Sequence, residues 1–166
     1  MLILITGLPG AGKTTFALAL AKATGAVHLN TDRVRAALGM RGQYDDESKE
    51  KVYLHLLRLL EQELREGKNA IVDATLFRPI VRQPFLDLAA RLGVPVRWIE
   101  VKAAEEVIEK RLETKRPFSE ADFKVYLQLK ELYEPLGFPH LVLRSDAKPL
   151  DQLVRDAITY LESPTP

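Results

Sequence analysis

Apolar residues follow two patterns along the chain, and these patterns predict strands and helices in alternation. Short apolar runs without polar alternation are typical of strands buried on both faces of a sheet. Such runs occupy Leu2–Thr6, Val27–Asn30, Ala70–Asp73, Pro95–Val101 and Leu141–Leu143. Longer amphipathic segments lie between them and predict helices over Lys13–Ala23, Thr31 toward Leu38, about Glu47–Glu66, Pro79–Leu92, Ala104–Thr114, Ser119–Tyr133 and Leu150–Leu161.

Local signals mark the ends of several predicted helices. Gly25, Gly67 and Gly93 follow three of them directly, at the position where glycine commonly ends a helix. Thr31-Asp32 is a predicted N-cap for the helix toward Leu38. The alternation of strands and helices predicts a parallel sheet of about five strands with helices on both faces.

Length and composition are consistent with one domain. The chain has 166 residues, of which 46% are hydrophobic and 28% are charged, enough to bury a core beneath a charged surface. We expect a single domain over residues 1–162 and a frayed tail over 163–166. No apolar run approaches the length of a membrane span, and the absence of cysteine is compatible with a cytoplasmic protein.

A glycine-rich segment after the first strand points to nucleotide binding. Gly7-Leu8-Pro9-Gly10-Ala11-Gly12-Lys13-Thr14 matches the P-loop pattern G-x-x-x-x-G-K-[ST] at every fixed position. Glycines let the backbone N–H groups surround a phosphate, and the following helix adds its positive end. We expect ATP to contact Gly7, Gly10, Ala11, Gly12, Lys13, Thr14 and Thr15. The fold class is therefore predicted to be a three-layer α/β/α P-loop NTPase.

Two residues are candidate magnesium ligands. The hydroxyl of Thr14 follows the P-loop lysine, where it can ligate Mg²⁺ beside the phosphates. Asp73 ends the strand Ala70–Asp73, at the same sheet edge as the P-loop, and can hold Mg²⁺ directly or through water. The alternative for Asp73 is that it is only a turn residue.

Among P-loop proteins, the sequence favours a compact kinase. The pattern Asn-Lys-x-Asp, with which GTPases bind guanine, is absent from the chain. The chain is also too short for an AAA+ motor module with its helical lid domain. A kinase would instead close a basic lid over the phosphates, and we place this lid at about residues 111–122.

Several charged side chains are candidates for the chemistry. Asp32 can accept the proton of an attacking hydroxyl, with Arg35 on the same helix face, or the pair can be an N-cap and a solvated arginine. Arg111, Lys115 and Arg116 can neutralise the γ-phosphate or form a solvated basic face. Arg78 and Arg82 can bind an acceptor phosphate or be ordinary surface charge.

The order of these motifs resembles the P-loop kinases grouped around the kinase domain of polynucleotide 5′-hydroxyl kinase. Zeta toxins, chloramphenicol phosphotransferase and gluconate kinase are more distant members of that group. The resemblance extends from Met1 to about Pro135. Its motifs are the P-loop, Asn30-Thr31-Asp32-Arg33-Val34-Arg35, Ile71-Val72-Asp73-Ala74-Thr75 and Arg111-Leu112-Glu113-Thr114-Lys115-Arg116.

The resemblance implies a role for each matching residue. Asp32 would be the general base, and Arg35 would steady the acceptor phosphate or the reacting centre. Arg111 and a neighbour would be the lid cations over ATP. This sequence departs from the family at the second lid cation, because Lys115 stands where a second arginine is usual, with Arg116 one residue further.

The expected function is ATP-dependent transfer of the γ-phosphate to a hydroxyl group, with Mg²⁺ as the metal. The acceptor expected first is a polynucleotide 5′-hydroxyl or a nucleotide-like molecule. One alternative is a small-molecule kinase for a sugar, an antibiotic or a sugar nucleotide. The net charge of +1 mildly favours it, since a long polynucleotide usually requires a wider basic surface. The other alternative is an ATP-binding regulatory module without transfer activity.

Overall fold

The computed structural model describes residues 1–114 and 121–164, and its centre is a parallel five-stranded sheet. The strand order is β2-β3-β1-β4-β5, and each neighbouring pair is parallel. The strands are β1 (Leu2–Thr6), β2 (Val27–Asn30), β3 (Ala70–Asp73), β4 (Val96–Lys102) and β5 (Leu141–Arg144). Because all strands run the same way, their carboxyl ends meet at one edge of the sheet.

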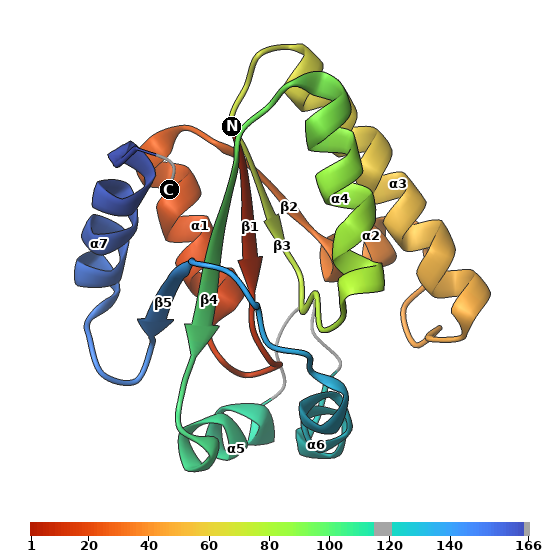
Figure 1. The fold of residues 1–166 in the computed structure, drawn as a ribbon. Helices are drawn as coiled ribbons and strands as arrows, with labels where there is room; N and C mark the ends of the chain where they lie inside the picture. The colour runs from red at the N-terminus through yellow and green to blue at the C-terminus, as the bar shows by residue number, and fades with distance from the viewer. Residues whose placement is uncertain (115–120, 165–166) are drawn as a thin grey trace.

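Helices form a layer on each face of this sheet and a group beyond its carboxyl edge. They are α1 (Lys13–Thr24), α2 (Thr31–Ala37), α3 (Asp46–Arg65), α4 (Pro79–Leu92), α5 (Glu105–Glu113), α6 (Phe123–Leu132) and α7 (Leu150–Glu162). Figure 1 shows α1 and α7 on one face, α3 and α4 on the other, and α5 and α6 beyond the strand ends. The predicted three-layer fold class is confirmed.

Alternation along β1 divides the core between the two faces. Leu2 and Leu4 belong to a cluster with α3 and α4, whereas Ile3 and Ile5 belong to a cluster with α1 and α7. Helix α3 contributes one buried stripe to the first cluster, namely Val52, Leu56, Leu60 and Leu64. Burying each such leucine is worth about 1.5–3 kcal/mol. Asp73 follows Ile71 by two residues on β3, so it faces the α1 side.

The helix ends agree with the sequence predictions except at α2 and at α6, which begins at Phe123 after the N-cap Asp122, later than the predicted Ser119. Gly25 and Gly93 cap α1 and α4 in the left-handed conformation, as predicted. The predicted Thr31-Asp32 cap is wrong, because the N-cap of α2 is Asn30, whose side chain accepts a hydrogen bond from the Arg33 N–H. Asp32 therefore lies inside the first turn of α2, which removes the interpretation that it is only an N-cap.

Residues 115–120 of the predicted lid at 111–122 lie outside the described part of the chain. In the predicted tail at 163–166, the Ser163 carbonyl accepts a hydrogen bond from Arg97. Residues 165–166 lie outside the described part of the chain. Within the described residues, no helix is long and apolar enough to cross a membrane.

Candidate functional site

The P-loop joins β1 to α1 through three glycines with positive φ angles. Gly7, Gly10 and Gly12 have φ values of 141°, 79° and 95°. A Cβ atom at Gly7 would lie 2.2 Å from the Val101 carbonyl oxygen, closer than real Cβ contacts. A Cβ at Gly10 would lie 2.9 Å from Ile108 Cγ2. The loop therefore requires glycine both for its backbone conformation and for its close approach to β4 and α5.

The start of α1 is suited to an anion. Its N-cap is Gly12, no side chain in the described residues makes a capping hydrogen bond to it, and its first turn holds no acidic residue. The N–H groups of a helix's first turn and the positive end of its dipole favour a phosphate there. Lys13 Nζ donates to the Leu8 carbonyl at 3.0 Å, which places the ammonium over the loop. Ala11 is buried, whereas Thr14 and Thr15 are exposed.

Arg111 reaches the P-loop from α5. Its Nη1 donates to the Gly10 carbonyl at 3.2 Å and to Ser145 Oγ at 2.8 Å, and its Nη2 lies 3.3 Å from the Ser145 carbonyl oxygen. Ser145 Oγ in turn donates to the Ala11 carbonyl at 2.6 Å. Arg111 is thus beside the predicted phosphate site, while Lys115 and Arg116 lie outside the described residues.

Sequence reasoning did not identify Ser145 as part of this site. One signal was available: Ser145 follows the last residue of β5, so it lies at the same sheet edge as Gly7 and Asp73. Its hydroxyl and carbonyl join the P-loop to Arg111. Ser145 therefore helps to fix the loop against α5.

The two carboxylate oxygens of Asp73 differ: one contacts hydrogen-bond donors, and the other has no partner among the described residues. The residue is fully buried, and its Oδ2 accepts from Asn30 Nδ2 at 2.8 Å and lies 3.2 Å from His28 Nε2. Oδ1 is buried and has no hydrogen-bond partner among the described residues. A buried oxygen of this kind costs stability unless a ligand pairs with it.

This arrangement fits a magnesium ion. A hard cation takes carboxylate and hydroxyl oxygens, and Mg²⁺ is usually held by one or two protein oxygens together with phosphates and water. Asp73 and Thr14 could supply these oxygens on the α1 side of the sheet. In the described residues there is no cluster of three His, Cys, Asp or Glu side chains able to hold a metal.

The start of α2 carries the predicted acid and arginine. Asp32 is half-buried in the first turn, whereas Arg35 is only 6% exposed. Arg35 Nη1 donates to the Gln43 carbonyl, and its guanidinium lies 4.4 Å from the ring centroid of Tyr44. The Nε of Arg35 is buried without a hydrogen-bond partner in the described residues. Arg35 therefore holds the loop between α2 and α3.

A partly buried tyrosine, Tyr53, lies near both charges. Burial raises the pKa of Tyr53 to about 12; of the nearby charges, Arg35 lowers this pKa and Asp32 raises it. Tyr53 is consequently protonated at neutral pH. The side chain near Asp32, the predicted base, is therefore an uncharged phenol and not a second anion.

Arg78 and Arg82 lie one helical turn apart at the start of α4 and differ in burial and in contacts. Arg78 is the N-cap of α4 in an extended conformation, with Nε 3.8 Å from Glu134 Oε1. Arg82 is 4% exposed and donates to the carbonyls of Leu76, at 2.7 Å, and of Glu134. The two side chains therefore differ in environment: Arg78 lies at the half-exposed start of α4, whereas Arg82 links two backbone segments inside the protein.

The turn between β3 and α4 is held in a strained conformation. Leu76 is fully buried and has a φ of 48°, which is uncommon for a residue other than glycine. Neighbouring elements donate to consecutive carbonyls of the turn: Thr6 Oγ1 to Thr75 at 2.5 Å, Arg82 to Leu76, and the Glu134 N–H to Phe77 at 2.8 Å. This turn directly follows Asp73, so the surrounding contacts fix the backbone beside the candidate site.

A buried carboxylate on β4 adds a second polar cluster that the sequence did not indicate. Glu100 pairs with Thr6 in the sheet register, beside the start of the P-loop. It accepts from Tyr133 Oη at 2.8 Å and lies 2.9 Å from Lys102 Nζ and 3.2 Å from His140 Nε2. Burial would raise the pKa of Glu100, but these three hydrogen bonds together lower it.

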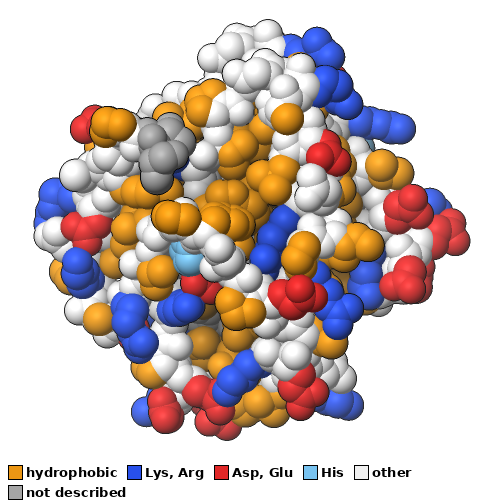
Figure 2. All heavy atoms as spheres, in the orientation of Figure 1, with side chains coloured by type: hydrophobic (Ala, Val, Ile, Leu, Met, Phe, Trp, Pro, Cys, Tyr) orange, Lys and Arg blue, Asp and Glu red, His pale blue; other side chains and the backbone are white. Residues whose placement is uncertain are grey.

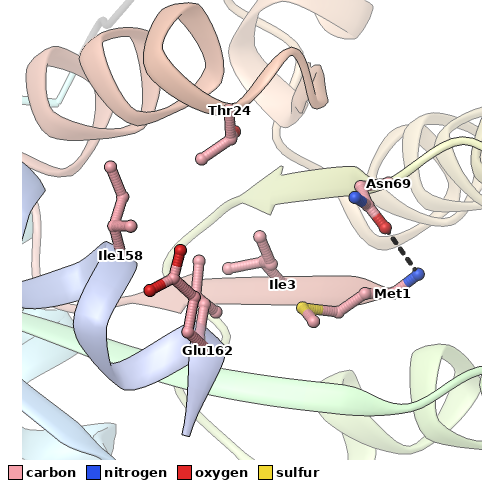
Figure 3. A pocket seen from close by; sticks show the side chains of 7 residues that line it. Met1, Ile3, Thr24, Asn69, Ile158 and Glu162 are labelled. Atoms are coloured by element: carbon pink, nitrogen blue, oxygen red, sulfur yellow. Dashed lines mark hydrogen bonds between the residues drawn. The ribbon is translucent and has the colours of Figure 1, made fainter.

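A hollow at the opposite edge of the sheet lacks such chemistry. It encloses about 150 Å³, and Figure 3 shows Ile3 and Ile158 among its lining, with the Met1 amino group donating to Asn69 Oδ1 at 2.9 Å. The P-loop, Asp73 and α2 all lie at the carboxyl edge instead. The candidate site is therefore at the carboxyl edge, where ligands bind in sheets of this kind.

Solved structures with the same fold include kinases. Mycobacterium tuberculosis APS kinase CysC, in complex with AMPPNP and APS, is 18% identical with a TM-score of 0.74, and the match covers 98% of this chain and 97% of that one. A sugar kinase from Janibacter sp. HTCC2649 is 22% identical with a TM-score of 0.72, covering 97% and 94%. Chaetomium thermophilum Kti12, in complex with ADP-AlF3, is 18% identical with a TM-score of 0.75, covering 98% and 100%.

A family model matches most of the chain. It is AAA_33, described as an AAA domain, and it matches residues 2–136. The matched segment contains the P-loop, α2, Asp73 and Arg111, and the chain belongs to the AAA_33 family of AAA domains.

Proposed function

We propose that this protein is an ATP-dependent kinase that transfers the γ-phosphate to a hydroxyl group of a small molecule. The observation that carries the proposal is the placement of Arg111 from α5 at the Gly10 carbonyl, beside the uncapped start of α1. A cation supplied from outside the P-loop is typical of phosphoryl transfer, where charge on the γ-phosphate must be neutralised. The kinases with the same fold support the same reaction class.

In this proposal each residue acts on a stated group. The backbone N–H groups from Gly7 to Thr15 hold the phosphates, and Lys13 and Arg111 neutralise the γ-phosphate. Mg²⁺, held by Thr14 and Asp73, supplies charge neutralisation between the phosphates when it is bound. Asp32 accepts the proton of the attacking hydroxyl, because it lies half-buried at the mouth formed by β2.

The acceptor-side arginines divide into two roles. Arg78, at the half-exposed start of α4, contacts the acceptor. Arg35 and Arg82 instead hold the segments around it, since both are buried and donate to backbone carbonyls. Of the arginines predicted to bind substrate, these two would act through Gln43, Leu76 and Glu134 rather than by direct contact.

A small-molecule acceptor is preferred here over the polynucleotide expected first from sequence. Two of the kinases that share the fold are named for small substrates, APS and a sugar. Figure 2 shows that, on the face drawn there, the described Lys and Arg side chains are interspersed with Asp and Glu around an apolar centre. A mixed surface of this kind gives little of the counterion release that drives polynucleotide binding.

The test is transfer of label from γ-labelled ATP in the presence of Mg²⁺. The acceptors are sugars, polyols, nucleosides, a sulfated nucleotide and 5′-hydroxyl oligonucleotides, each with the wild-type protein and with Asp32→Asn. We expect label on a small molecule and a loss of about 10²–10⁴-fold in rate in Asp32→Asn, because the variant lacks the base. Asp46→Asn is the matched control, since Asp46 is a fully exposed carboxylate in the first turn of α3.

Other outcomes separate the alternatives. Label on oligonucleotide 5′ ends alone would restore the polynucleotide acceptor. ATP binding without transfer to any acceptor, unchanged in Asp32→Asn, would favour the regulatory module. Equal rates for wild type and Asp32→Asn on a labelled small molecule would keep the kinase and remove Asp32 as its base.

A further inference from the structure

Asn30 lies between the metal side and the acceptor side of the candidate site. It ends β2 and pairs with Asp73 in the sheet register. The residue is 5% exposed, so its amide cannot be satisfied by bulk water. Both ends of this amide instead make contacts within the protein.

The nitrogen of the amide is bound to Asp73. Asn30 Nδ2 donates to Asp73 Oδ2 at 2.8 Å and lies 3.2 Å from the Asp73 carbonyl oxygen. His28 Nε2 approaches the same Oδ2 at 3.2 Å, from a side chain that is 6% exposed. With two neighbours at Oδ2, the carboxylate is fixed so that Oδ1 is the oxygen left without a partner among the described residues.

The oxygen of the same amide is bound to α2. Asn30 Oδ1 accepts from the Arg33 N–H at 3.0 Å and so caps the helix whose first turn contains Asp32. Because Asn30 uses its nitrogen on Asp73 and its oxygen on Arg33, a rotation of the amide would break both contacts. One rigid side chain therefore sets the distance between the carboxylate on β3 and the acid on α2.

We propose that Asn30 is a positioning residue that orients the Asp73 carboxylate for the metal and holds Asp32 in a fixed place relative to it. The inference rests on the proposed function and adds to it a residue that touches neither metal nor acceptor. His28, whose Nε2 lies 3.2 Å from the same Oδ2, supports the same orientation. Side chains that orient metal ligands in this way commonly change metal affinity by about 10–100-fold when they are removed.

The opposing hypothesis is that Asn30 is only a helix cap, and one substitution separates the two roles. Serine is also a good N-cap, but its short hydroxyl lacks the amide nitrogen that reaches Asp73. Asn30→Ser therefore keeps the cap and removes the carboxylate contact. Asp45→Ser is the matched control, because Asp45 caps α3 through the Ser48 N–H at 2.9 Å, and none of its described hydrogen bonds is to Asp73.

The experiment measures metal binding rather than turnover. Each protein is saturated with ADP, Mn²⁺ is added in steps, and free Mn²⁺ is followed by electron paramagnetic resonance. Thermal unfolding and ADP binding without metal are measured alongside. In Asn30→Ser we expect about tenfold weaker Mn²⁺ binding or more, with ADP binding without metal unchanged and a melting temperature close to that of Asp45→Ser.

A second variant covers the case in which Asn30→Ser does not fold. His28→Ala removes the other neighbour of Asp73 Oδ2 and leaves the α2 cap intact, and we expect it to weaken Mn²⁺ binding several-fold. A folded Asn30→Ser with wild-type Mn²⁺ affinity would overturn the proposal and leave Asn30 as a cap. Loss of ADP binding without metal would also overturn it, because the effect would then lie in the P-loop.

Failure of the proposed function would look different. A wild-type protein that binds Mn²⁺–ADP but transfers phosphate to no acceptor would contradict the kinase and leave the role of Asn30 to be judged from the binding data. A kinase that transfers phosphate normally, with Mn²⁺ affinity equal in wild type and Asn30→Ser, would contradict only the role of Asn30.

Discussion

At the scale of single residues, the candidate site depends on positions where the backbone leaves no room for a side chain. Gly7 is the clearest case, because a Cβ atom there would overlap the Val101 carbonyl at 2.2 Å while φ is 141°. Gly25 also has a positive φ, of 72°, but this value lies close to the left-handed helical region, and nothing lies within 4 Å of its Cβ position. Gly7 therefore differs from Gly25 both in its backbone conformation, which lies outside that region, and in the overlap that a side chain would meet.

Gly7→Ala should therefore destabilise the protein more than Gly25→Ala does. We expect about 1–2 kcal/mol for Gly25→Ala, from the left-handed conformation alone. Overlap in a packed region adds about 1–3 kcal/mol at Gly7. Urea unfolding gives both values, and calorimetry with ADP should show weaker binding only for Gly7→Ala. Equal unfolding midpoints would mean that β1 and β4 separate to accept the methyl group at little cost.

At the scale of elements, Arg82 connects the turn after β3 to the segment that follows α6. Its guanidinium donates to the carbonyls of Leu76 and Glu134. A planar guanidinium with several N–H groups can bind both acceptors at once. The ammonium of lysine is a single point charge on a flexible stem. Arg82→Lys would therefore leave a buried carbonyl without its donor.

We expect Arg82→Lys to lower the free energy of unfolding by about 1–3 kcal/mol, the usual cost of an unsatisfied buried polar group. The KM for the acceptor should change little. Arg78→Lys is the control: its partly exposed side chain should change stability by no more than about 0.5 kcal/mol. A raised acceptor KM in Arg82→Lys without loss of stability would instead support the direct substrate contact first suggested by the sequence.

The outcome at Arg82 illustrates what the sequence could and could not predict at this scale. Apart from the start of α6, helix and strand bounds agree closely with prediction because glycine caps and apolar runs are local signals. The spacing of Arg78 and Arg82 is local too, but the partner at Glu134 is 52 residues away along the chain. Nothing in the neighbourhood of Arg82 indicates that carbonyl, so its burial could not be foreseen.

The same limit applies to the candidate site. Gly7–Thr14, Asp32, Asp73 and Arg111 were recognisable because each belongs to a motif or ends an element. Ser145 and Glu100 belong to no motif, and both act through residues brought close only by the sheet order β2-β3-β1-β4-β5. That order depends on how helices pack on each face, which a single sequence does not specify.

At the scale of the whole molecule, the segment 133–140 returns from α6 to β5 across the sheet, and Glu100 holds it there. Tyr133 and His140, at the two ends of this segment, both contact the Glu100 carboxylate, and Leu136 between them is buried in the core. Burial, together with the bond to Glu100, raises the pKa of Tyr133 to about 12. The carboxylate therefore joins β4 to a segment that is also held by the backbone bonds of Glu134 to Arg82 and Phe77 and by the buried side chain of Leu136.

This arrangement predicts a pH-dependent contribution to stability. The pKa of Glu100 is lowered from its ordinary value of 4.5, so its contribution is complete above about that pH and is lost as the pH falls through the folded-state value. Glu100→Gln keeps the shape but not the charge and should cost about 1–3 kcal/mol at pH 7. Urea unfolding of wild type and variant from pH 7 to pH 3 should show this difference shrinking below about pH 4.5. The other carboxylates are present in both proteins, so their titration cancels in the difference between the two unfolding free energies. If this difference stayed constant from pH 7 to pH 3, the charge of Glu100 would not be what holds the segment.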